Sequence, residues 1–396
     1  MSVATLDDLL GEPSGVRGRR VFVRADLNVP LRDGRPSDDT RIRAALGTLR
    51  RLLAGGARVV LASHLGRPKG AAKPELSLRP VAARLAELLG RPVAFAPDCI
   101  GPAAEAAVAK LADGEVLLLE NLRFHEEEEK NDPAFARQLA ALADVYVNDA
   151  FGTAHRAHAS TAGIVAFVRS AVAGDLLREE LDHLRVVRGP ERPLLCLLGG
   201  AKVSDKLAVL EALAPHTDVL AVGGAMAYTF LLAQGLPTGD SLVEPDGAPD
   251  ARRVLAAARA AGRELLLPVD HVIAEKLEAG AATRVVKEVP PGWRGVDIGP
   301  ETAARYAAAA RQARTIFWNG PMGIFEIDAF AKGTEAVAQA VANSSARSVV
   351  GGGDSLAAVN KLGLGARIGH LSTGGGASLE YVQGLPLPGV VALERA

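Results

Sequence analysis

The chain has 396 residues, of which 48% are hydrophobic and 23% charged, and its formal net charge is −1. The near-neutral charge argues against nucleic acid or an anionic membrane as the main partner, and no apolar stretch approaches the ~20 residues of a transmembrane helix. Because the chain exceeds the size at which one hydrophobic core keeps growing, we expect two domains.

The N-terminus and the cysteines indicate a reducing compartment. Residues 1–8 lack the basic start and the apolar core of a signal peptide. Cys99 and Cys196 each border or lie in an apolar run, so we expect two reduced core residues rather than a disulfide framework. These features predict a soluble, cytoplasmic α/β protein.

The first half of the chain alternates short apolar runs with helical patterns. Helices are predicted at 40–54, at 79–89 before Gly90, and at 175–188 before Gly189 and Pro190. Short β-branched runs between helices predict buried strands of a parallel sheet. Four such runs break off into polar residues, and they cover 21–23, 59–62, 117–119 and 145–147.

The polar residues after these four runs predict an anion site. In parallel sheets ligands bind beyond the carboxyl ends of the strands, so the four ends should converge. Only ten of the 45 basic residues are Lys, which makes any single Arg weak evidence, and the prediction rests on positions at strand ends. An Asp in such a pocket must accept from a ligand hydroxyl, although Asp and Asn are also common turn residues. The candidates are Asp26, Asn28, Arg41, His64, Arg67, Arg123 and Arg156.

The second half repeats the alternation with a different signature. Its strand ends offer glycine and backbone N–H groups rather than arginine, which predicts a second parallel sheet built for a different ligand. The predicted strands cover residues 194–198, 219–222, 265–269, 315–318, 348–350 and 370–373.

Two glycine loops in this half suit a nucleotide phosphate. In residues 199–206, Lys202 and Lys206 lie four apart and would share one face if a helix opens there. In residues 351–355, three glycines precede Asp354 and Ser355, a combination that suits phosphates with Mg²⁺. Each loop alone also fits an ordinary strand–helix turn, but the two together favour a nucleotide. The Walker A spacing and the protein-kinase motifs are absent from the sequence.

Other polar clusters have simpler interpretations. His125 followed by residues 126–129, all Glu, is interpreted as a solvated helix start rather than a metal cluster. His155 and His158 lack Cys or carboxylate partners at zinc-like spacing.

Eight ordered motifs strongly resemble phosphoglycerate kinase along essentially the whole chain. They are V-R-A-D-L-N-V-P (23–30), S-H-L-G-R-P-K-G (63–70), L-L-E-N-L-R-F-H (118–125), N-D-A-F-G-T-A-H-R-A-H-A-S (148–160), G-G-A-K-V-S-D-K (199–206), F-W-N-G-P-M-G-I-F-E (317–326), G-G-G-D-S (351–355) and S-T-G-G-G-A-S-L-E (372–380).

The resemblance implies a fold and a reaction. The fold is two doubly wound, Rossmann-like parallel-sheet domains that face a cleft and are joined by an interdomain helix. The reaction is reversible phosphoryl transfer from 1,3-bisphosphoglycerate to MgADP, giving 3-phosphoglycerate and MgATP in glycolysis or gluconeogenesis. The implied domains are 1–173 for 3-phosphoglycerate, 174–189 as interdomain helix and hinge, 190–378 for nucleotide, and 379–396 as a segment returning to the N-terminal domain.

The resemblance also implies site residues. The 3-phosphoglycerate site would use Asp26, Asn28, Arg41, His64, Leu65, Gly66, Arg67, Arg123 and Arg156. The nucleotide site would use Lys202, Lys206, Asn319, Gly352, Gly353 and Ser355 near the phosphates, Gly223, Gly224 and Pro321 around the base, and Glu326 on the ribose. Asp354 would bind Mg²⁺. Charge on the transferring group would be met by Arg41, Lys202, Gly353 and Gly376.

The chain departs from the family pattern at a few positions, and two other functions would share some of its features. Gly47 stands where the family often has Pro, and residues 174–176 replace a more apolar stretch near the hinge. A non-catalytic, two-lobed anion-binding protein would also have two pockets, but it would need no nucleotide loops. A Rossmann dehydrogenase would need G-x-G-x-x-G after the first strand, where this chain has Arg24-Ala25-Asp26. We expect a monomer.

Overall fold

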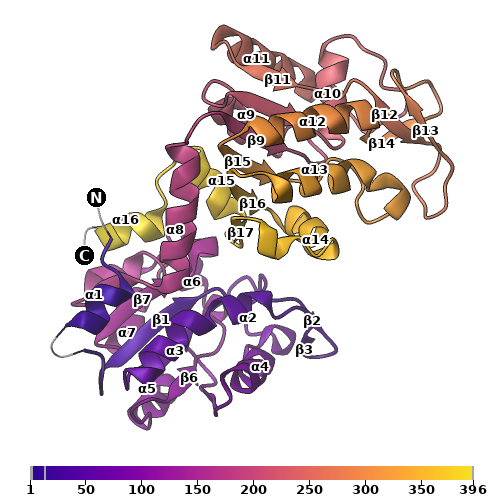
Figure 1. Cartoon of the computed structure of the whole chain (residues 1–396). Coiled ribbons are helices and arrows are strands. Elements are labelled where there is room, and N and C mark those ends of the chain that lie inside the picture. Colours follow the sequence, from indigo (N-terminus) through magenta and orange to yellow (C-terminus); the bar gives the residue numbers. More distant parts are fainter. Residues whose placement is uncertain (1–2, 13–14, 395–396) are drawn as a thin grey trace. The chain divides into compact units, whose positions relative to one another are not determined.

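The computed structural model describes residues 3–12 and 15–394, and it contains two units of parallel sheet and helix (Figure 1). Unit 1 runs to Leu181 and includes the segment that starts at Pro386, whereas unit 2 runs from Asp182 to Leu385. The boundary therefore falls inside helix α8 (Asp175–Arg188). The second boundary falls at Pro386 rather than at 379, because helix α15 (Gly376–Val382) belongs to unit 2.

Unit 1 is built on a six-stranded parallel sheet with the order β5-β6-β4-β1-β7-β8. The first strand is central and the chain winds outward in both directions from it, which is a doubly wound topology. All four strands predicted from the first half are present and are consecutive neighbours in the sheet. The strands are β1 (Arg20–Ala25), β4 (Arg58–Ala62), β5 (Ala94–Phe95), β6 (Val116–Leu118), β7 (Val145–Asp149) and β8 (Ala171–Ala173), with a hairpin of β2 (Leu31–Arg32) and β3 (Arg35–Pro36).

The helices of unit 1 largely follow the predicted pattern. Gly90 ends α4 in the left-handed conformation (φ 67°), as its position predicted. The single helix predicted at 40–54 is wrong in one respect, because it is interrupted at Ala45, two residues before Gly47, a weak helix former. The helices are α1 (Leu6–Gly11), α2 (Thr40–Ala44), α3 (Leu46–Ala54), α4 (Arg79–Leu89), α5 (Gly101–Ala109), α6 (Glu126–Glu129), α7 (Pro133–Ala141) and α16 (Pro388–Glu394), with short 3₁₀ turns η1 (Pro74–Leu76), η2 (Leu122–Phe124), η3 (Phe151–Thr153) and η4 (Gly163–Phe167).

Unit 2 repeats the doubly wound pattern with the order β11-β10-β9-β15-β16-β17. The strand predicted at 265–269 ends earlier, at Leu266, because Pro268 cannot donate to the ladder. The parallel strands are β9 (Leu194–Leu198), β10 (Val219–Val222), β11 (Glu264–Leu266), β15 (Thr315–Asn319), β16 (Arg347–Gly351) and β17 (His370–Ser372). A three-stranded antiparallel sheet that the sequence did not predict comprises β12 (His271–Ala274), β13 (Thr283–Val286) and β14 (Arg294–Ile298).

Seven helices within the described residues complete unit 2. They are α9 (Leu207–Leu213), α10 (Met226–Ala233), α11 (Ala248–Ala260), α12 (Pro300–Gln312), α13 (Lys332–Asn343), α14 (Gly353–Lys361) and α15, with 3₁₀ turns η5 (Pro245–Gly247), η6 (Asp328–Phe330) and η7 (Gly365–Arg367). Cys99 and Cys196 are buried and free, as predicted. Among the described residues, no helix has both the length and the apolar character needed to cross a lipid bilayer.

Candidate active site

The predicted anion-binding residues of unit 1 follow neighbouring strands of one sheet. Asp26 and Asn28 come directly after β1, His64 after β4, and Arg123 lies on η2 after β6. Because β6, β4, β1 and β7 are consecutive, their carboxyl ends lie along one edge of the sheet, and the topological switch falls between β1 and β7. We call Asp26, Asn28, Arg41, His64, Arg67, Arg123 and Arg156 the basic cluster.

Arg41 is held by the loop that follows β1. Its Nη1 lies 3.0 Å from Oδ2 and 3.1 Å from Oδ1 of Asp26, and it also donates to the carbonyl of Asn28 at 3.3 Å. The Asp26 side chain is only 10% exposed, whereas that of Arg41 is 36% exposed. The pair is therefore internally neutral, and the guanidinium keeps solvent-facing donors for a ligand.

The loop after β4 is fixed by two other members of the cluster. The N–H of Gly66 donates to Oδ1 of Asn28 at 2.8 Å, and Nη1 of Arg123 donates to the carbonyl of Gly66 at 3.0 Å. Gly66 has φ of 63°, and a Cβ there would approach Leu76 to 2.8 Å. Glycine is thus required, and the loop joins three strand ends into one structure.

His64 is buried and neutral, and its tautomer is determined by Arg24. Nη2 of Arg24 lies 3.2 Å from Nδ1 of His64, and because arginine can only donate, Nδ1 must accept and Nε2 must hold the proton. Burial lowers the pKa of His64 well below its usual value, and the charges of Arg24, Arg123, Arg41 and His158 lower it further. His64 therefore offers a neutral N–H donor.

Arg24 itself is compensated by a buried acid that sequence reasoning missed. Nε of Arg24 donates to Oγ of Ser160 at 2.8 Å, and Ser160 donates its hydroxyl at 2.5 Å and its backbone N–H at 2.9 Å to Glu128. The interpretation of residues 126–129 as solvated is wrong at Glu128, which is fully buried because it faces this network. The available signal was an Arg inside the apolar run of β1.

The remaining members lie closer to solvent. Arg67 is exposed, and Arg156 is half-buried with its Nε 3.2 Å from Nε2 of His155. Leu65, predicted for the same site but outside the basic cluster, is instead buried, and its N–H donates to Oδ1 of Asn121 at 3.2 Å. The pKa of His158 is lowered to about 3, first by burial and then by the charges of Arg123, Arg24 and Arg156.

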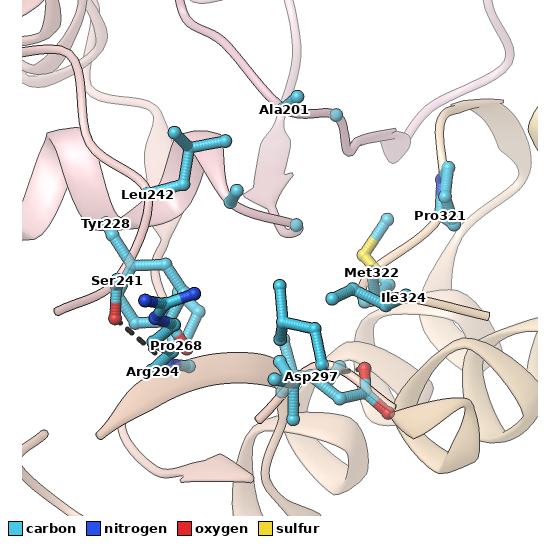
Figure 2. Close-up of a pocket in the computed structure, with 18 of the residues that line it drawn as sticks. Ala201, Tyr228, Ser241, Leu242, Pro268, Arg294, Asp297, Pro321, Met322 and Ile324 are labelled. Carbon is cyan, nitrogen blue, oxygen red and sulfur yellow. Dashed lines mark hydrogen bonds between the residues drawn. The ribbon is translucent and has the colours of Figure 1, made fainter. Parts of the chain in front are cut away.

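In unit 2 the structure contains a cavity of about 670 Å³ (Figure 2). Figure 2 shows Leu242, Met322 and Ile324 around it, so its walls are mainly apolar. Of the predicted nucleotide residues, Gly224, Pro321, Glu326 and Asp354 line this cavity. Volume and lining suit a flat, mostly apolar ligand with one polar end.

Gly223 and Gly224 are needed because other atoms of the chain pass close to them. A Cβ on Gly224, whose φ is 68°, would lie 2.6 Å from the carbonyl oxygen of Gly200. A Cβ on Gly223 would lie 2.4 Å from Sδ of Met322. Gly224 therefore lines the cavity directly, whereas Gly223 leaves room for Met322, which lines it.

Lys206 occupies the topological switch of the second sheet. Its Nζ donates to the carbonyl of Gly199 after β9, and to the carbonyl and Oδ1 of Asn319 at the end of β15 at 2.8 and 2.6 Å. Burial lowers its pKa to about 8, against the opposing effect of Asp354 and Asp205. Helix α9 begins only at Leu207, so the predicted shared helical face is wrong, and Lys202 is exposed on the loop.

The second glycine loop, residues 351–355, leads into helix α14. Gly352 has φ of 91°, and α14 begins at Gly353 with Asp354 exposed in its first turn. Ser355 is buried, and its Oγ accepts from the N–H of Gly320 at 2.5 Å. Gly376 begins α15, after Gly375 with φ of 55°. The loop thus offers backbone N–H groups, whereas the Ser355 hydroxyl holds the neighbouring turn.

Sequence reasoning missed two acids at the cavity, Asp240 and Asp297. Asp297 of β14 lines it, is buried, and accepts from the N–H of Gly333 at 2.5 Å and of Ile298 at 2.9 Å. Burial raises its pKa to about 7. The available signal was weak, because Asp297 merely stands between Val296 and Ile298.

Comparison with known proteins identifies the family. A family model described as phosphoglycerate kinase matches residues 12–385. The chain belongs to the phosphoglycerate kinase family. Curated phosphoglycerate kinases from Moorella thermoacetica and Rubrobacter xylanophilus are each 58% identical to it, over 99% and 96% of both chains.

Solved structures of the phosphoglycerate kinase family agree with this fold. The Coxiella burnetii phosphoglycerate kinase has a TM-score of 0.89 at 41% identity and covers 100% of this chain and 99% of its own. That of Pyrococcus horikoshii OT3 has a TM-score of 0.86 at 34% identity, covering 99% and 98%.

Proposed function

We propose that the chain transfers a phosphoryl group reversibly from 1,3-bisphosphoglycerate to ADP, giving 3-phosphoglycerate and ATP. The observation that supports this most is the family match over residues 12–385. The basic cluster in unit 1 and the apolar cavity in unit 2 supply the two kinds of site that such a reaction requires.

The basic cluster is the proposed 3-phosphoglycerate site. Asp26 accepts from the substrate hydroxyl, and the neutral Nε2–H of His64 donates to a substrate oxygen. Arg67, Arg123 and Arg156 neutralise the phosphate and carboxylate, because forked guanidinium donors match both groups. Arg41, whose Nη1 is anchored on Asp26, faces the charge that develops during transfer.

The cavity is the proposed nucleotide site, with the base among its apolar walls and the phosphates toward Asp354. Asp354 is an exposed carboxylate beside N–H groups at the start of α14, an arrangement that fits Mg²⁺ shared with phosphate oxygens. Bound Mg²⁺ would supply neutralising charge. Lys202, Lys206 and the backbone of Gly353 and Gly376 supply the remaining positive potential.

No covalent enzyme intermediate is required, because the acyl phosphate is already activated. The protein contributes positioning, charge neutralisation and exclusion of water. We propose a cytoplasmic monomer; the relatives from Triticum aestivum and Nicotiana tabacum are named cytosolic.

A coupled assay that follows MgATP-dependent conversion of 3-phosphoglycerate tests the function. Turnover is expected with both substrates together and with neither alone. If both ligands bind but no ADP appears, the chain is a non-catalytic anion-binding protein.

Asp354→Asn tests the proposed role of this carboxylate in binding Mg²⁺. Calorimetry should show MgADP binding weakened by roughly tenfold or more, with the binding of metal-free ADP nearly unchanged.

A further inference from the structure

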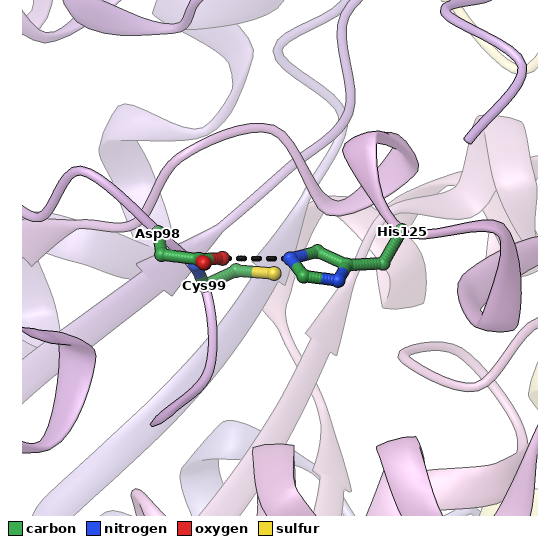
Figure 3. A group of neighbouring side chains, drawn as sticks. All are labelled: Asp98, Cys99 and His125. Atoms are coloured by element: carbon green, nitrogen blue, oxygen red, sulfur yellow. Dashed lines mark hydrogen bonds and ion pairs between the residues drawn. The ribbon is translucent and has the colours of Figure 1, made fainter. Parts of the chain in front are cut away.

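Asp98, Cys99 and His125 form a cluster in unit 1 that the proposed reaction does not use (Figure 3). Asp98 and Cys99 follow β5, and His125 immediately precedes α6. Nε2 of His125 lies 2.7 Å from Oδ1 of Asp98. One ligand atom from each of the three side chains lies within 4.8 Å of the other two.

We propose that these three side chains bind a divalent ion of the zinc class, with water as the fourth ligand. An imidazole nitrogen, a thiolate sulfur and a carboxylate oxygen are the donors that Zn²⁺ accepts in tetrahedral sites. Hard ions such as Mg²⁺ and Ca²⁺ prefer sites made only of oxygen, so the donor set discriminates against them.

The three side chains differ in their exposure to solvent. The side chains of Asp98 and His125 are 45% and 28% exposed, whereas Cys99 is buried behind them. An ion can therefore enter from solvent and keep one water, while the sulfur stays shielded. Three protein ligands with one open position is the arrangement of zinc sites that retain a water.

Local contacts hold the donors in place. The N–H of Cys99 donates to Oδ1 of Asp98 at 2.6 Å, and the ring of His125 packs against Phe135 with centroids 5.4 Å apart. Little side-chain freedom is then lost when the ion binds.

Binding replaces the hydrogen bond between His125 and Asp98. The Nε2 proton moves to Nδ1, the thiol proton is released to solvent, and bonds form from the ion to Nε2, sulfur and carboxylate.

Titration of the chelator-treated full chain with Co²⁺ tests the proposal, because a cobalt–thiolate bond gives a near-ultraviolet charge-transfer band. We expect one band that saturates at one ion per chain and is displaced by Zn²⁺. Cys99→Ser should abolish the band. Asp98→Asn and His125→Gln should weaken Zn²⁺ binding in calorimetry by roughly tenfold or more.

Two matched controls make the test specific. Cys196 is the other buried thiol and lies near Thr217 at 3.3 Å, so Cys196→Ser should keep the band. Asp354→Asn should keep it as well, because that carboxylate belongs to the proposed nucleotide site. Absence of the band in the unsubstituted protein, or an equal band in Cys99→Ser, would overturn the proposal. If Cys99→Ser does not fold, unchanged Zn²⁺ affinity in His125→Gln would overturn it instead.

Discussion

At the scale of single residues, the basic cluster combines groups with different tasks. Arg41 is anchored on Asp26, Arg123 fixes the loop at Gly66, and Arg67 is exposed to solvent. Because these contacts differ, we expect substitution of Arg41 to affect mainly kcat and substitution of Arg67 to affect mainly KM.

Arg41→Ala should lower kcat more than it raises KM for 3-phosphoglycerate. The guanidinium should interact more strongly with charge in the transition state than in the bound substrate, so kcat should fall by roughly 100-fold or more. Arg67→Ala is the matched comparison and should mainly raise KM. A near-normal kcat in Arg41→Ala would refute this role.

Arg24→Lys should loosen the tautomer of His64 without unfolding the protein. Lysine keeps the charge opposite Glu128 but loses the fork that reaches both Ser160 and Nδ1 of His64. Nitrogen NMR should report Nε2–H alone in the unsubstituted protein and a mixture in the variant, with KM raised by roughly tenfold. Arg20→Lys at the exposed start of β1 is the control; an unchanged His64 signal in Arg24→Lys would contradict the assignment.

At the scale of elements, the start of α8 depends on a buried carboxylate. Oδ1 of Asp149, at the end of β7, accepts from the N–H groups of Leu176 and Leu177 at 2.9 and 3.3 Å. Within the described part of the chain its Oδ2 makes no hydrogen bond. Burial raises the pKa of Asp149 to about 7, and the Thr48 hydroxyl and the α8 N–H groups oppose the shift.

The raised pKa predicts a pH-dependent cost. The folded state favours the protonated form of Asp149, and this preference adds to the free energy of unfolding. The contribution is fully present below the unfolded pKa near 3.8 and is lost as pH rises through about 7. Asp149→Asn keeps an oxygen that can accept from the N–H groups at the start of α8, but it cannot ionise. The variant should therefore avoid the pH-dependent loss of stability, which amounts to up to about 4 kcal/mol. Urea unfolding should show the variant gaining on the unsubstituted protein between pH 5 and 8. Asp144→Asn, at an exposed ion pair, should show no such gain; parallel curves for Asp149→Asn would exclude the effect.

Two glycines flanking this region should respond oppositely to alanine. A Cβ on Gly174 would lie 2.2 Å from Oδ1 of Asp149, so close packing explains this glycine, and Gly174→Ala should destabilise by about 1–3 kcal/mol. Gly47, in the first turn of α3, has no atom within 4 Å of an added Cβ. Gly47→Ala should stabilise by about 0.5–1 kcal/mol. Thermal unfolding of both variants measures the two changes in stability. A change in the same direction in both variants would contradict the packing argument.

At the scale of the whole molecule, the residues proposed for each substrate divide cleanly between the units. Those for 3-phosphoglycerate belong to unit 1, and those for the nucleotide to unit 2. Direct transfer requires that the two units bring acyl oxygen and ADP oxygen into contact and exclude water.

We therefore expect closure when both substrates are bound. Small-angle scattering should show the smallest radius of gyration for the ternary mixture, below either binary complex, because only both ligands together can bridge the units. Arg41→Ala, with binding retained, is a control that separates closure from chemistry. An unchanged radius in all four states would argue against a ligand-driven closure.

The sequence by itself determined the two parallel sheets and the order of their strands along the chain. Apolar β-branched runs ending in polar residues are a local signal, because a strand covered on both faces is mostly apolar along its length. The same signal located Asp26, His64, Asn319 and the glycine loops, and Gly90 as a helix end. The family motifs then supplied roles that the pattern alone left open.

Only the tertiary structure decided which buried charges compensate one another. Glu128 lies in a run of four glutamates, and nothing local distinguishes it from its exposed neighbours until Ser160 and Arg24 are brought beside it. The same holds for the capping of α8 by Asp149 and for the meeting of His125 with Asp98 and Cys99. These contacts join segments far apart in sequence, and burial, which sets the cost of each charge, is a property of the folded chain.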